Sequence, residues 1–368
     1  MNSELGKLIV LAIDTSCDDT SVAVVQGARV LSNVISSQDE IHGEWGGVVP
    51  DLARRAHNER IDAVIEQALT RASRNSGEKI NFETIDAIAA TYGPGLAIAL
   101  EVGLKKAQAL ASEHGLPFVA VNHMEGHLLS ALAQNSRGSG QIRVEDLRFP
   151  LLGLLISGGH TEIVLMKSFG DYEIVAQTLD DAVGEAYDKV ARMLGLGYPG
   201  GKVLSEMAKL VSEKLARPDE MYALPIPLNN DDRLAFSYSG LKTAVYYKVK
   251  QLKESAGGLT KKQIHNFAAS FEKAAISHLQ QKLSMAIEKF QPKMILVGGG
   301  VASSAKVRAG LRKVAKNLEL PIFFPSNNKL YVDNAAMIGV AGYFKLVRGE
   351  LARSSIDRDP RASISKAA

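Results

Sequence analysis

Two segments with the same pattern, one at the start of each half of the chain, constrain its fold most strongly. In the first, apolar runs at residues 7–14 and 21–25 flank a polar turn of acidic and hydroxyl side chains. In the second, apolar runs at residues 151–156 and 162–166 flank a Gly-rich turn. Two apolar runs joined by a short turn are typical of a β-hairpin. Because the hairpin recurs, we predict a duplicated architecture with two related halves.

Strand and helix patterns alternate through both halves. Residues 58–72 carry apolar side chains at helical spacing, and residues 85–90 and 118–121 are short apolar runs typical of buried strands. We also predict helices at 96–113, 180–194, 262–290 and 302–318, and a strand at 293–297. The 368 residues suffice for two domains of roughly 180 residues each. These patterns together predict two α/β domains with a cleft between them.

The lobes are assigned from the position of a polar segment rich in Gly, Ser and Arg, which is typical of a surface loop. We place an N-terminal lobe at residues 1–135, the surface loop at 136–148, a C-terminal lobe at 149–350 and a tail at 351–368. The two candidate functional segments, a His-x-x-x-His helix and the Gly-rich loops, then fall in different lobes.

The composition excludes several classes of protein. Hydrophobic residues make up 46% of the chain and charged residues 23%, and no apolar run is long enough for a transmembrane helix. Cys17 is the only cysteine, so no intrachain disulfide is possible, which fits a reducing compartment. The first predicted strand starts near Leu8, and we expect no signal or transit peptide before it. The net charge of +3 permits an anionic partner but does not require one.

Residues 122–127, Asn-His-Met-Glu-Gly-His, follow a predicted strand and open a predicted helix. His123 and His127 share one face of that helix, at a spacing that lets two imidazoles bind one metal ion. A His pair beside apolar residues is more often structural, so the spacing alone leaves both interpretations open. Asp333 is a candidate third ligand, although an Asp or Asn before a helix is also an ordinary N-cap. Two His and one carboxylate would leave coordination positions open, as in working Fe or Zn sites.

Two Gly-rich loops are candidates for binding an anion. Residues 157–159 lie between two predicted strands, where small residues let backbone N–H groups converge on a phosphate. Residues 298–300 precede a predicted helix and could cradle a nucleotide in the same way. Each loop alone could equally be a tight turn. The chain contains no Walker sequence and no Rossmann fingerprint after the first strand, so neither a P-loop NTPase nor a dinucleotide dehydrogenase is favoured.

Ten motifs in a fixed order carry a resemblance to one known family. They are DTSCDDT at 14–20, GGVVP at 46–50, GPGL at 93–96, NHMEGH at 122–127, SGGHT at 157–161, GEAYDK at 184–189, YPGG at 198–201, FSYSGLK at 236–242, GGV at 299–301 and DNAAM at 333–337. Each motif is weak alone, but ten in order over nearly the whole chain are specific. The chain resembles the TsaD-type tRNA threonylcarbamoyltransferases, formerly called O-sialoglycoprotein endopeptidase-like proteins.

The resemblance implies an actin-like ATPase fold, with two ribonuclease-H-like lobes around a central cleft, in agreement with the two hairpin-led halves. It implies transfer of the threonylcarbamoyl group from threonylcarbamoyl-AMP to the exocyclic amine of the adenosine 3′ of the anticodon, in tRNAs that read codons starting with A. AMP is released. The implied cofactor is one divalent metal ion, iron in preference to zinc, held by His123, His127 and Asp333.

The resemblance also implies where the substrate binds and which partners act. The implied substrate-binding residues are Leu155, Ile156, Ser157, Gly158, Gly159, Asp188, Gly201 and Ser304. A carboxylate from Asp18 or Asp19, at the tip of the first hairpin, could remove the proton of the attacking amine. A bacterial member would act on tRNA with a TsaB-type paralogue and a TsaE-type ATPase, and a mitochondrial-type member as a homodimer. We expect a cytoplasmic protein without membrane attachment, the mitochondrial matrix being the alternative.

The chain departs from the family pattern at a few positions. Asp14 and Asp19 stand where many bacterial members have Glu, and Ser304 stands where an Asn usually contacts the nucleotide. Serine keeps one hydrogen-bonding group but loses the amide. The segment after Arg353 matches none of the motifs, and we expect it to be disordered.

Three other functions fit parts of the pattern. A zincin peptidase needs His-Glu-x-x-His, whereas Glu125 lies two positions after His123, roughly 200° around the helix and away from the shared His face. A sugar or acetate kinase of the same fold class would use magnesium and carboxylates at the γ-phosphate and would not need the His pair. A scaffold for a catalytic paralogue would need no metal ligands, so intact His123, His127 and Asp333 argue against it.

Overall fold

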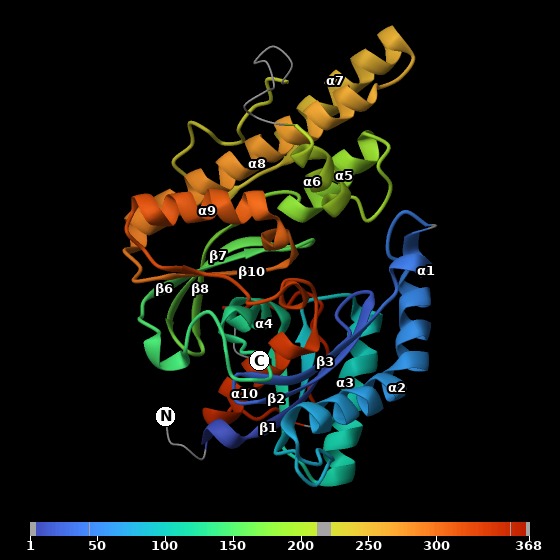
Figure 1. Cartoon of the computed structure of the whole chain (residues 1–368), viewed down its shortest axis with the longest axis vertical. Helices are drawn as coiled ribbons and strands as arrows, with labels where there is room; N and C mark the ends of the chain where they lie inside the picture. Colours follow the sequence, from blue (N-terminus) through green and yellow to red (C-terminus); the bar gives the residue numbers. More distant parts are fainter. Residues whose placement is uncertain (1–4, 44, 212–221, 354, 366–368) are drawn as a thin grey trace.

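The computed structural model describes residues 5–43, 45–211, 222–353 and 355–365, and its fold is built around two β-sheets (Figure 1). The first sheet has the strand order β3-β2-β1-β4-β5. Its strands are β1 (Ile9–Asp14), β2 (Asp19–Gln26), β3 (Arg29–Ser37), β4 (Ala87–Gly93) and β5 (Phe118–Asn122). Strands β1 to β3 are antiparallel neighbours, whereas β4 pairs in parallel with β1 and β5 in parallel with β4. The predicted first hairpin is confirmed as β1–β2.

The second sheet repeats the first. Its strands are β6 (Leu151–Ile156), β7 (Thr161–Ser168), β8 (Asp171–Thr178), β9 (Ala235–Phe236), β10 (Ile295–Gly298) and β11 (Ile322–Phe323). Strands β6, β7 and β8 are antiparallel neighbours, and β10 pairs in parallel with β6, as β4 does with β1. The duplicated architecture predicted from the two hairpins is therefore confirmed, and β3 and β8 extend each hairpin by a strand that the sequence patterns had not indicated.

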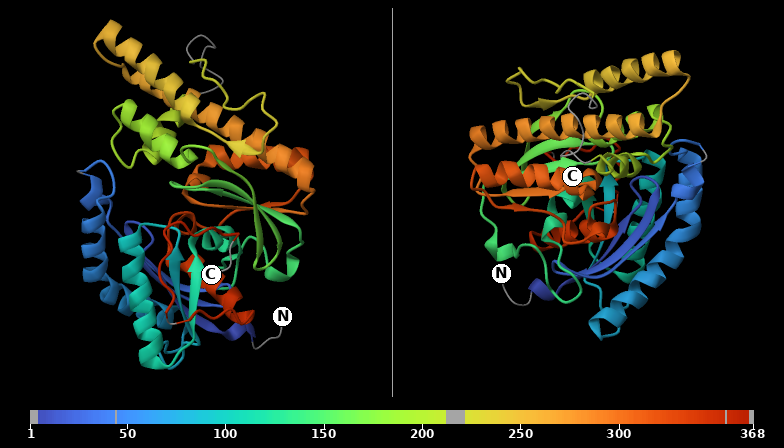
Figure 2. Two further views of the ribbon diagram at one scale, coloured as in Figure 1. Left: turned by 180° about the vertical axis from the view of Figure 1, so that it is seen from behind. Right: turned by 45° about the horizontal axis from the view of Figure 1, so that its top comes forward.

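Helices and sheets alternate in layers from one end of the molecule to the other (Figure 2). Two helices, α2 (Pro50–Ser76) and α3 (Ala97–His114), cover the outer face of the first sheet. The short helix α4 (His123–Leu129) and α10 (Ala335–Val347) lie between the two sheets. The outer face of the second sheet packs against helices of the second half, α5 (Val183–Met193), α6 (Gly201–Lys209), α7 (Ser239–Ala256), α8 (Lys261–Phe290) and α9 (Ala305–Asn317). A short helix, α1 (Asp39–Gly43), precedes α2.

The apolar core follows the alternation of side chains along the strands. Along β1, Leu11 and Ile13 are buried toward α2 and α3, while Val10 and Ala12 are buried toward α10. A strand buried on both faces reads as a continuous apolar run, as these residues do. Among the described residues, no helix is both long and apolar enough to cross a bilayer.

Helix α10 lies against β1 and β2 of the first sheet, although it follows the second sheet in the sequence (Figure 1). Two glycines of α10 allow this close approach. A Cβ at Gly339 would lie 2.9 Å from Cγ1 of Val25, and a Cβ at Gly342 would lie 2.8 Å from Cβ of Ala89. The chain thus returns to the N-terminal lobe before it ends, so α10, which our division of the sequence included in residues 149–350, shares its core with the first sheet.

Three predicted helices begin several residues from their predicted starts, among them α9, which begins at Ala305 rather than at residue 302. Helix α2 begins at Pro50 rather than near residue 58, which agrees with the preference for Pro in the first turn of a helix. Helix α5 begins at Val183 rather than at residue 180. The carboxylate of Asp180 instead accepts hydrogen bonds from the backbone N–H groups of Tyr238 and Ser239, at 2.7 and 3.2 Å, and so fixes the loop before α7.

The expectation of disorder after Arg353 is wrong for the described residues 355–365. Ala362 and Ile364 are buried in the cores of the first lobe. The backbone N–H of Asp359 donates to the carbonyl of Tyr92 at 2.8 Å. The absence of a family motif carried no information about order, because a few small apolar side chains and backbone hydrogen bonds are enough to hold such a segment.

The packing of α10 predicts an unusual response to alanine. A Gly→Ala change inside a helix normally stabilises by up to about 1 kcal/mol. For Gly339→Ala we expect the opposite, a loss of about 1–2 kcal/mol in the free energy of unfolding, because the methyl group meets Val25 and Ala12. Urea unfolding measures it, with Gly240→Ala in α7 as the control, since a Cβ there meets nothing within 4 Å. Equal effects of the two variants would contradict this packing.

Candidate metal centre and cleft

The histidine helix begins where β5 ends. Asn122 is the last residue of β5 and the N-cap of α4, since its side-chain oxygen accepts hydrogen bonds from the N–H groups of Met124 and Glu125 at 2.8 and 3.3 Å. An Asn at this position satisfies helix donors that would otherwise lack partners. The buried strand and the cap together fix the direction of the first turn, and His123 is its first residue. The spacing then places His127 one turn later on the same face.

Two glycines of the 298–300 loop bring the second sheet against this helix. A Cβ at Gly298 would lie 2.1 Å from the carbonyl oxygen of His127, and a Cβ at Gly299, whose φ is +95°, would lie 2.4 Å from the carbonyl oxygen of Ile156. Both glycines therefore serve close contact between protein backbones. Of the three glycines, only Gly300 has room for a side chain, since a Cβ there would lie 4.0 Å from its nearest neighbour, the carbonyl oxygen of Tyr331. The sequence pattern had indicated close backbone approach here, and the structure shows that the partner of Gly298 is α4 itself.

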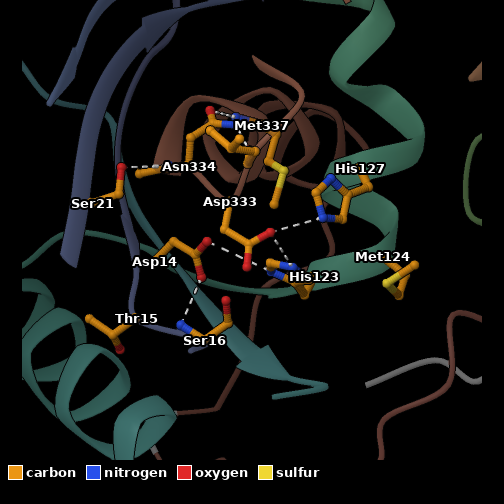
Figure 3. Close-up of polar contacts among 12 residues, drawn as sticks. Asp14, Thr15, Ser16, Ser21, His123, Met124, His127, Asp333, Asn334 and Met337 are labelled. Atoms are coloured by element: carbon orange, nitrogen blue, oxygen red, sulfur yellow. Dashed lines mark hydrogen bonds and ion pairs between the residues drawn. The ribbon is translucent and has the colours of Figure 1, made fainter. Parts of the chain in front are cut away.

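Asp333 meets the two histidines across a long sequence separation (Figure 3). Its Oδ1 lies 3.2 Å from Nε2 of His127 and 3.4 Å from Nε2 of His123. The candidate ligand atoms of the three residues all lie within 4.8 Å of one another. The two imidazole rings are nearly perpendicular, at 84°, with centroids 4.7 Å apart. Both rings thus present Nε2 to the same carboxylate oxygen.

The N-cap interpretation of the 333–337 motif applies to Asn334 and not to Asp333. The side-chain oxygen of Asn334 accepts a hydrogen bond from the N–H of Met337 at 3.1 Å, and Asn334 is fully buried. The backbone N–H of Ala335 donates to Oγ of Ser21 on β2 at 2.8 Å. With the helix start fixed in this way, Asp333 lies outside the helix and its carboxylate points to the histidines.

A second carboxylate stands behind His123. Oδ2 of Asp14 lies 3.7 Å from Nδ1 of His123, and its Oδ1 accepts a hydrogen bond from the N–H of Ser16 at 3.2 Å. Asp14 is only 1% exposed. Carboxylates beside the non-ligating nitrogen commonly orient a metal-binding imidazole. Asp14 therefore connects the first hairpin turn to the ligand set.

The buried charges explain the electrostatics of the centre. Burial opposes protonation of His123, but the negative charges of Asp333 and Asp14 outweigh it and raise the pKa of His123 to about 10. Burial lowers the pKa of His127 below its usual value. Burial also acts to raise the pKa of Asp333, but the two histidines prevail and hold it well below the usual range. At neutral pH this environment keeps Asp333 ionised and leaves one imidazole neutral.

The donor set fits a divalent metal ion of intermediate hardness. Two imidazole nitrogens and one carboxylate oxygen suit iron or zinc better than magnesium or calcium, which prefer oxygen ligands alone. His127 is fully buried and His123 is 7% exposed, whereas the side chain of Asp333 is 33% exposed. The open side faces a cleft of about 510 Å³ lined by His123 and Asp333 among others. A substrate could therefore reach the ion from the cleft.

The cleft brings together most of the residues expected at the substrate site. Four of them line it, namely Ser157, Gly158, Gly159 and Asp188, and so does the candidate base Asp18. Leu155 and Ile156 lie beneath, fully buried in β6. Gly201 lies beside the cleft, and its N–H and that of Gly200 donate to Oδ1 of Asp188 at 2.7 and 2.9 Å. Asp188 thus caps α6, and burial raises its pKa above the usual value.

The remaining two expected residues, Asp19 and Ser304, do not line the cleft either. Asp19 is the first residue of β2 and pairs with Ser37 of β3. Ser304 precedes α9, and its Oγ lies 3.5 Å from the buried carboxylate of Glu272. Asp19 was proposed as an acidic residue at the tip of the first hairpin, and Ser304 from its place in the family pattern. Neither indication specifies which side chain faces the open space.

The sequence patterns missed several cleft residues, chiefly His160, Lys189, Arg192 and Tyr198. Burial, with the nearby charges of His123 and His127, lowers the pKa of His160 to about 4, so this imidazole is neutral at physiological pH. Lys189 pairs with Asp181 and Glu185 at 3.0 and 2.8 Å. All four lie in or next to the motifs at 157–161, 184–189 and 198–201, and that proximity was the available indication.

Glu125 and Cys17 show which chemistry the site does not perform. Glu125 points away from the histidine face, as expected, since its Oε1 accepts a hydrogen bond from the hydroxyl of Tyr172 at 2.9 Å. It cannot serve the metal-bound water of a zincin from there. Cys17 lines the cleft, but burial and the charge of Asp18 raise the pKa of its thiol, which argues against a thiolate nucleophile.

The ligand set predicts loss of metal affinity on removal of one imidazole. We expect His127→Ala to weaken Co²⁺ binding by about 100-fold or more, because two ligands remain and the cavity stays buried. Titration of the apoprotein with Co²⁺, followed by visible absorption, measures this. His114→Ala is the control, since His114 is an exposed residue stacked on Phe82 away from the cleft. Equal affinities of the His127 variant and the parent protein would exclude His127 as a ligand.

The raised pKa of His123 predicts a proton-coupled metal site. With a pKa of about 10, His123 is protonated at neutral pH in the metal-free protein, and binding must displace that proton. Affinity should therefore increase with pH, about tenfold per unit between about pH 6 and pH 8. Calorimetry in buffers of different ionisation enthalpy counts the protons released. A pH-independent affinity with no proton release would show that His123 is already neutral.

Comparison with known proteins places the chain in a family. The sequence model of TsaD, tRNA N6-adenosine threonylcarbamoyltransferase, matches residues 29–340. A protein named tRNA N6-adenosine threonylcarbamoyltransferase from Caldicellulosiruptor saccharolyticus is 40% identical over 358 residues, which cover 97% of this chain and 98% of that protein. A protein of the same name from Clostridioides difficile is 40% identical over 365 residues, which cover 98% of this chain and all of that protein.

Solved structures with a similar fold are more distant in sequence. Full-length HypF in a phosphate- and nucleotide-bound form is 12% identical with a TM-score of 0.58, over 94% of this chain and 57% of HypF. Component A of the Acidaminococcus fermentans (R)-2-hydroxyglutaryl-CoA dehydratase is 14% identical with a TM-score of 0.51, over 92% and 99% of the two chains. These similarities concern the fold alone and agree with the predicted actin-like ATPase fold. On its sequence, the chain belongs to the TsaD family of tRNA N6-adenosine threonylcarbamoyltransferases.

Proposed function

We propose that this protein transfers the threonylcarbamoyl group from threonylcarbamoyl-AMP to the exocyclic N6 amine of the adenosine 3′ of the anticodon, in tRNAs that read codons starting with A. In this reaction the amine nitrogen bonds to the carbamoyl carbon, and the bond from that carbon to the phosphate oxygen breaks. AMP leaves, and the amine loses one proton. Because the donor is already activated, the work of the protein is to position the two reactants and stabilise the phosphate as it leaves.

The proposal rests on one observation: a single cleft is lined both by the candidate metal ligands and by an open glycine turn. The His123–Asp333 side of the cleft holds the candidate metal ligands, and the turn of Gly158 and Gly159 faces the same space. A Cβ at either glycine would meet no atom within 4 Å, so the turn is open to a ligand. Family membership supplies the reaction, and the cleft supplies a place for an anionic adenylate beside a metal centre.

The chain's own residues have proposed roles in substrate binding. The turn at residues 157–159, following Leu155 and Ile156 of β6, would hold the phosphate through backbone N–H groups. Asp188, whose Oδ1 is engaged by Gly200 and Gly201, keeps Oδ2 for a sugar hydroxyl. Ser304 is proposed as a weaker contact to the nucleoside, because a hydroxyl replaces the amide of Asn there.

The metal is proposed to be iron, held by His123, His127 and Asp333. When bound, the ion would supply a Lewis acid that polarises the adenylate. The two-His, one-carboxylate set with open positions favours iron, although zinc also accepts it. Asp14 would orient His123 through its Nδ1 side, at the distance of 3.7 Å described above.

The proton of the attacking amine is proposed to go to a carboxylate of the first hairpin turn. Asp18 lines the cleft and Asp19 does not, so Asp18 is the better placed of the two. A base must come within hydrogen-bond reach of the proton that it removes, directly or through one water. Asp19, at the start of β2, would act by holding the turn in place.

Partners and compartment are inferred from the family. The proposed acceptor is tRNA, and a TsaB-type paralogue and a TsaE-type ATPase are the proposed protein partners. The relatives described above are bacterial proteins, so we propose a bacterial cytoplasmic location and a complex of several proteins in preference to a mitochondrial homodimer.

Transfer can be measured directly. The purified protein and the two partner proteins are mixed with threonylcarbamoyl-AMP and unmodified tRNA, and the nucleosides are then weighed by mass spectrometry after digestion. We expect threonylcarbamoyladenosine to form, and to fall below detection with the His123→Ala, His127→Ala double variant, because the metal centre is lost. Asp18→Asn should lower turnover by about 100-fold or more, and Asp19→Asn by less.

The His114→Ala variant serves as the control for loss of an imidazole elsewhere. A transferase from one of the relatives, assayed in parallel, shows that the tRNA and the threonylcarbamoyl-AMP can react. If the reference enzyme modifies the tRNA and this protein does not, the proposed function is wrong. If Asp18→Asn retains full turnover, Asp18 is not the base.

A further inference from the structure

The C-terminal segment, residues 355–365, packs directly against a loop that forms one wall of the cleft. That loop runs from Gly93, the last residue of β4, to Leu96, and Pro94, Gly95 and Leu96 line the cleft. The N–H of Asp359 donates to the carbonyl of Tyr92 at 2.8 Å, and the N–H of Gly95 donates to the carbonyl of Pro360 at 3.3 Å. The two backbones are thus hydrogen-bonded on both sides of Gly93.

Gly93 shows how close this contact is. A Cβ at Gly93 would lie 1.8 Å from the carbonyl oxygen of Asp359 and 3.0 Å from Cβ of Ala362. Any side chain at this position would have to displace the C-terminal segment or the loop, since backbone atoms cannot be moved as cheaply as the end of a flexible side chain. The glycine at position 93 is therefore explained by the C-terminal segment rather than by the cleft.

The other side of the same loop carries the acidic turn of the first hairpin. The N–H of Leu96 donates to the carbonyl of Ser16 at 2.7 Å, and a Cβ at Gly95 would lie 2.4 Å from that carbonyl oxygen. Ser16 and Asp18 line the cleft with the loop. The loop is thus held between the C-terminal segment on one side and the turn that carries Asp18 on the other.

The C-terminal segment is itself anchored to the first lobe. Ala362 and Ile364 are 7% and 5% exposed. Nε2 of Gln108 on α3 donates to the carbonyl of Ile356 at 2.8 Å. Arg358 lies 3.5 Å from the carboxylate of Glu101, also on α3. Because α3 begins immediately after the loop, the segment braces both ends of the connection from β4 to α3.

We propose that the C-terminal segment is a positioning element for the reaction, which holds the Gly93–Leu96 loop against Ser16 and so fixes the wall of the cleft that carries Asp18. Displacements of about 1 Å at a reacting centre can cost about 100-fold in rate. The segment also meets the cap of the histidine helix, where Nδ2 of Asn122 donates to the carbonyl of Ala362 at 3.5 Å. Its shorter hydrogen bonds, at 2.8 and 3.3 Å, join it to Tyr92 and Gly95, so we expect its main effect to act through the loop. The kinetic part of this proposal rests on the proposed function, and the structural part does not.

The test uses the full chain, a chain ending at Arg353, the variant Gly93→Ala, and the two changes combined. Gly258→Ala is the matched control, since a Cβ there meets nothing within 4 Å. Hydrogen exchange of the peptide that contains the Gly95 and Leu96 amides reports on the loop. We expect about tenfold faster exchange in the truncated chain and in Gly93→Ala, with no further increase on combination, because both changes remove the same contact.

Two further measurements, of kcat for transfer and of the spectrum of the metal centre, distinguish positioning from simple stabilisation of the fold. A segment that only stabilised the fold would leave kcat unchanged. We expect kcat to fall about 10- to 100-fold in both variants, while the absorption spectrum of bound Co²⁺ is unchanged. Unchanged exchange at residues 95–96 in Gly93→Ala overturns the proposal, as does faster exchange with unchanged kcat. If the truncated chain does not fold, Gly93→Ala alone decides. If the full chain transfers nothing, the proposed function fails, and the exchange result still decides whether the segment holds the loop.

Discussion

The structure depends on one long-range contact, the approach of Asp333 to Nε2 of His123 and His127 at 3.4 and 3.2 Å. The two imidazoles come from the helix after β5, and the carboxylate comes from Asp333, which precedes the N-cap of α10. The contact is possible because α10 returns to the first sheet and packs beside α4. Its glycines and Gly298 remove the side chains that would keep these backbones apart. The ligand set is therefore a product of how two layers pack, and its geometry depends on that packing.

The buried charged groups at the contact between Asp333 and the two histidines stabilise one another and have to be considered together. Buried imidazoles without a partner cost stability, and so does an isolated buried carboxylate. Here Asp333 and Asp14 stand on opposite sides of His123 and raise its pKa against the effect of burial, whereas burial lowers the pKa of His127. A divalent ion bound at Nε2 and Oδ1 would neutralise the same cluster without the proton. The metal and the proton are thus alternative occupants of one electrostatic site, which links metal affinity to pH.

The local features of the fold and site could be predicted from the sequence, and their spatial relations could not. The two hairpins, the helix at His123 and the candidate third ligand Asp333 follow from apolar patterns and motifs that are contained within a few residues. Strands β3 and β8 are polar at several positions, and the return of α10 depends on surfaces far apart in the chain. Gly298 was expected to approach a nucleotide because a strand, glycines and a helix follow in order, yet its neighbour is the backbone of His127. A pattern of glycines indicates close approach but does not identify the partner.

The duplication explains how two chemistries share one cleft. The β1–β2 turn and the β6–β7 turn occupy equivalent places in the two sheets, and both line the cleft through Asp18 and through Ser157 to His160. The first turn has acidic residues, and the second has glycines with open space around them. In the proposed reaction, the first turn would accept a proton and the second would receive an anion, and one turn would not do both, because carboxylates would repel the phosphate. The duplicated fold, with turns of opposite character, would then separate the proposed base from the leaving group.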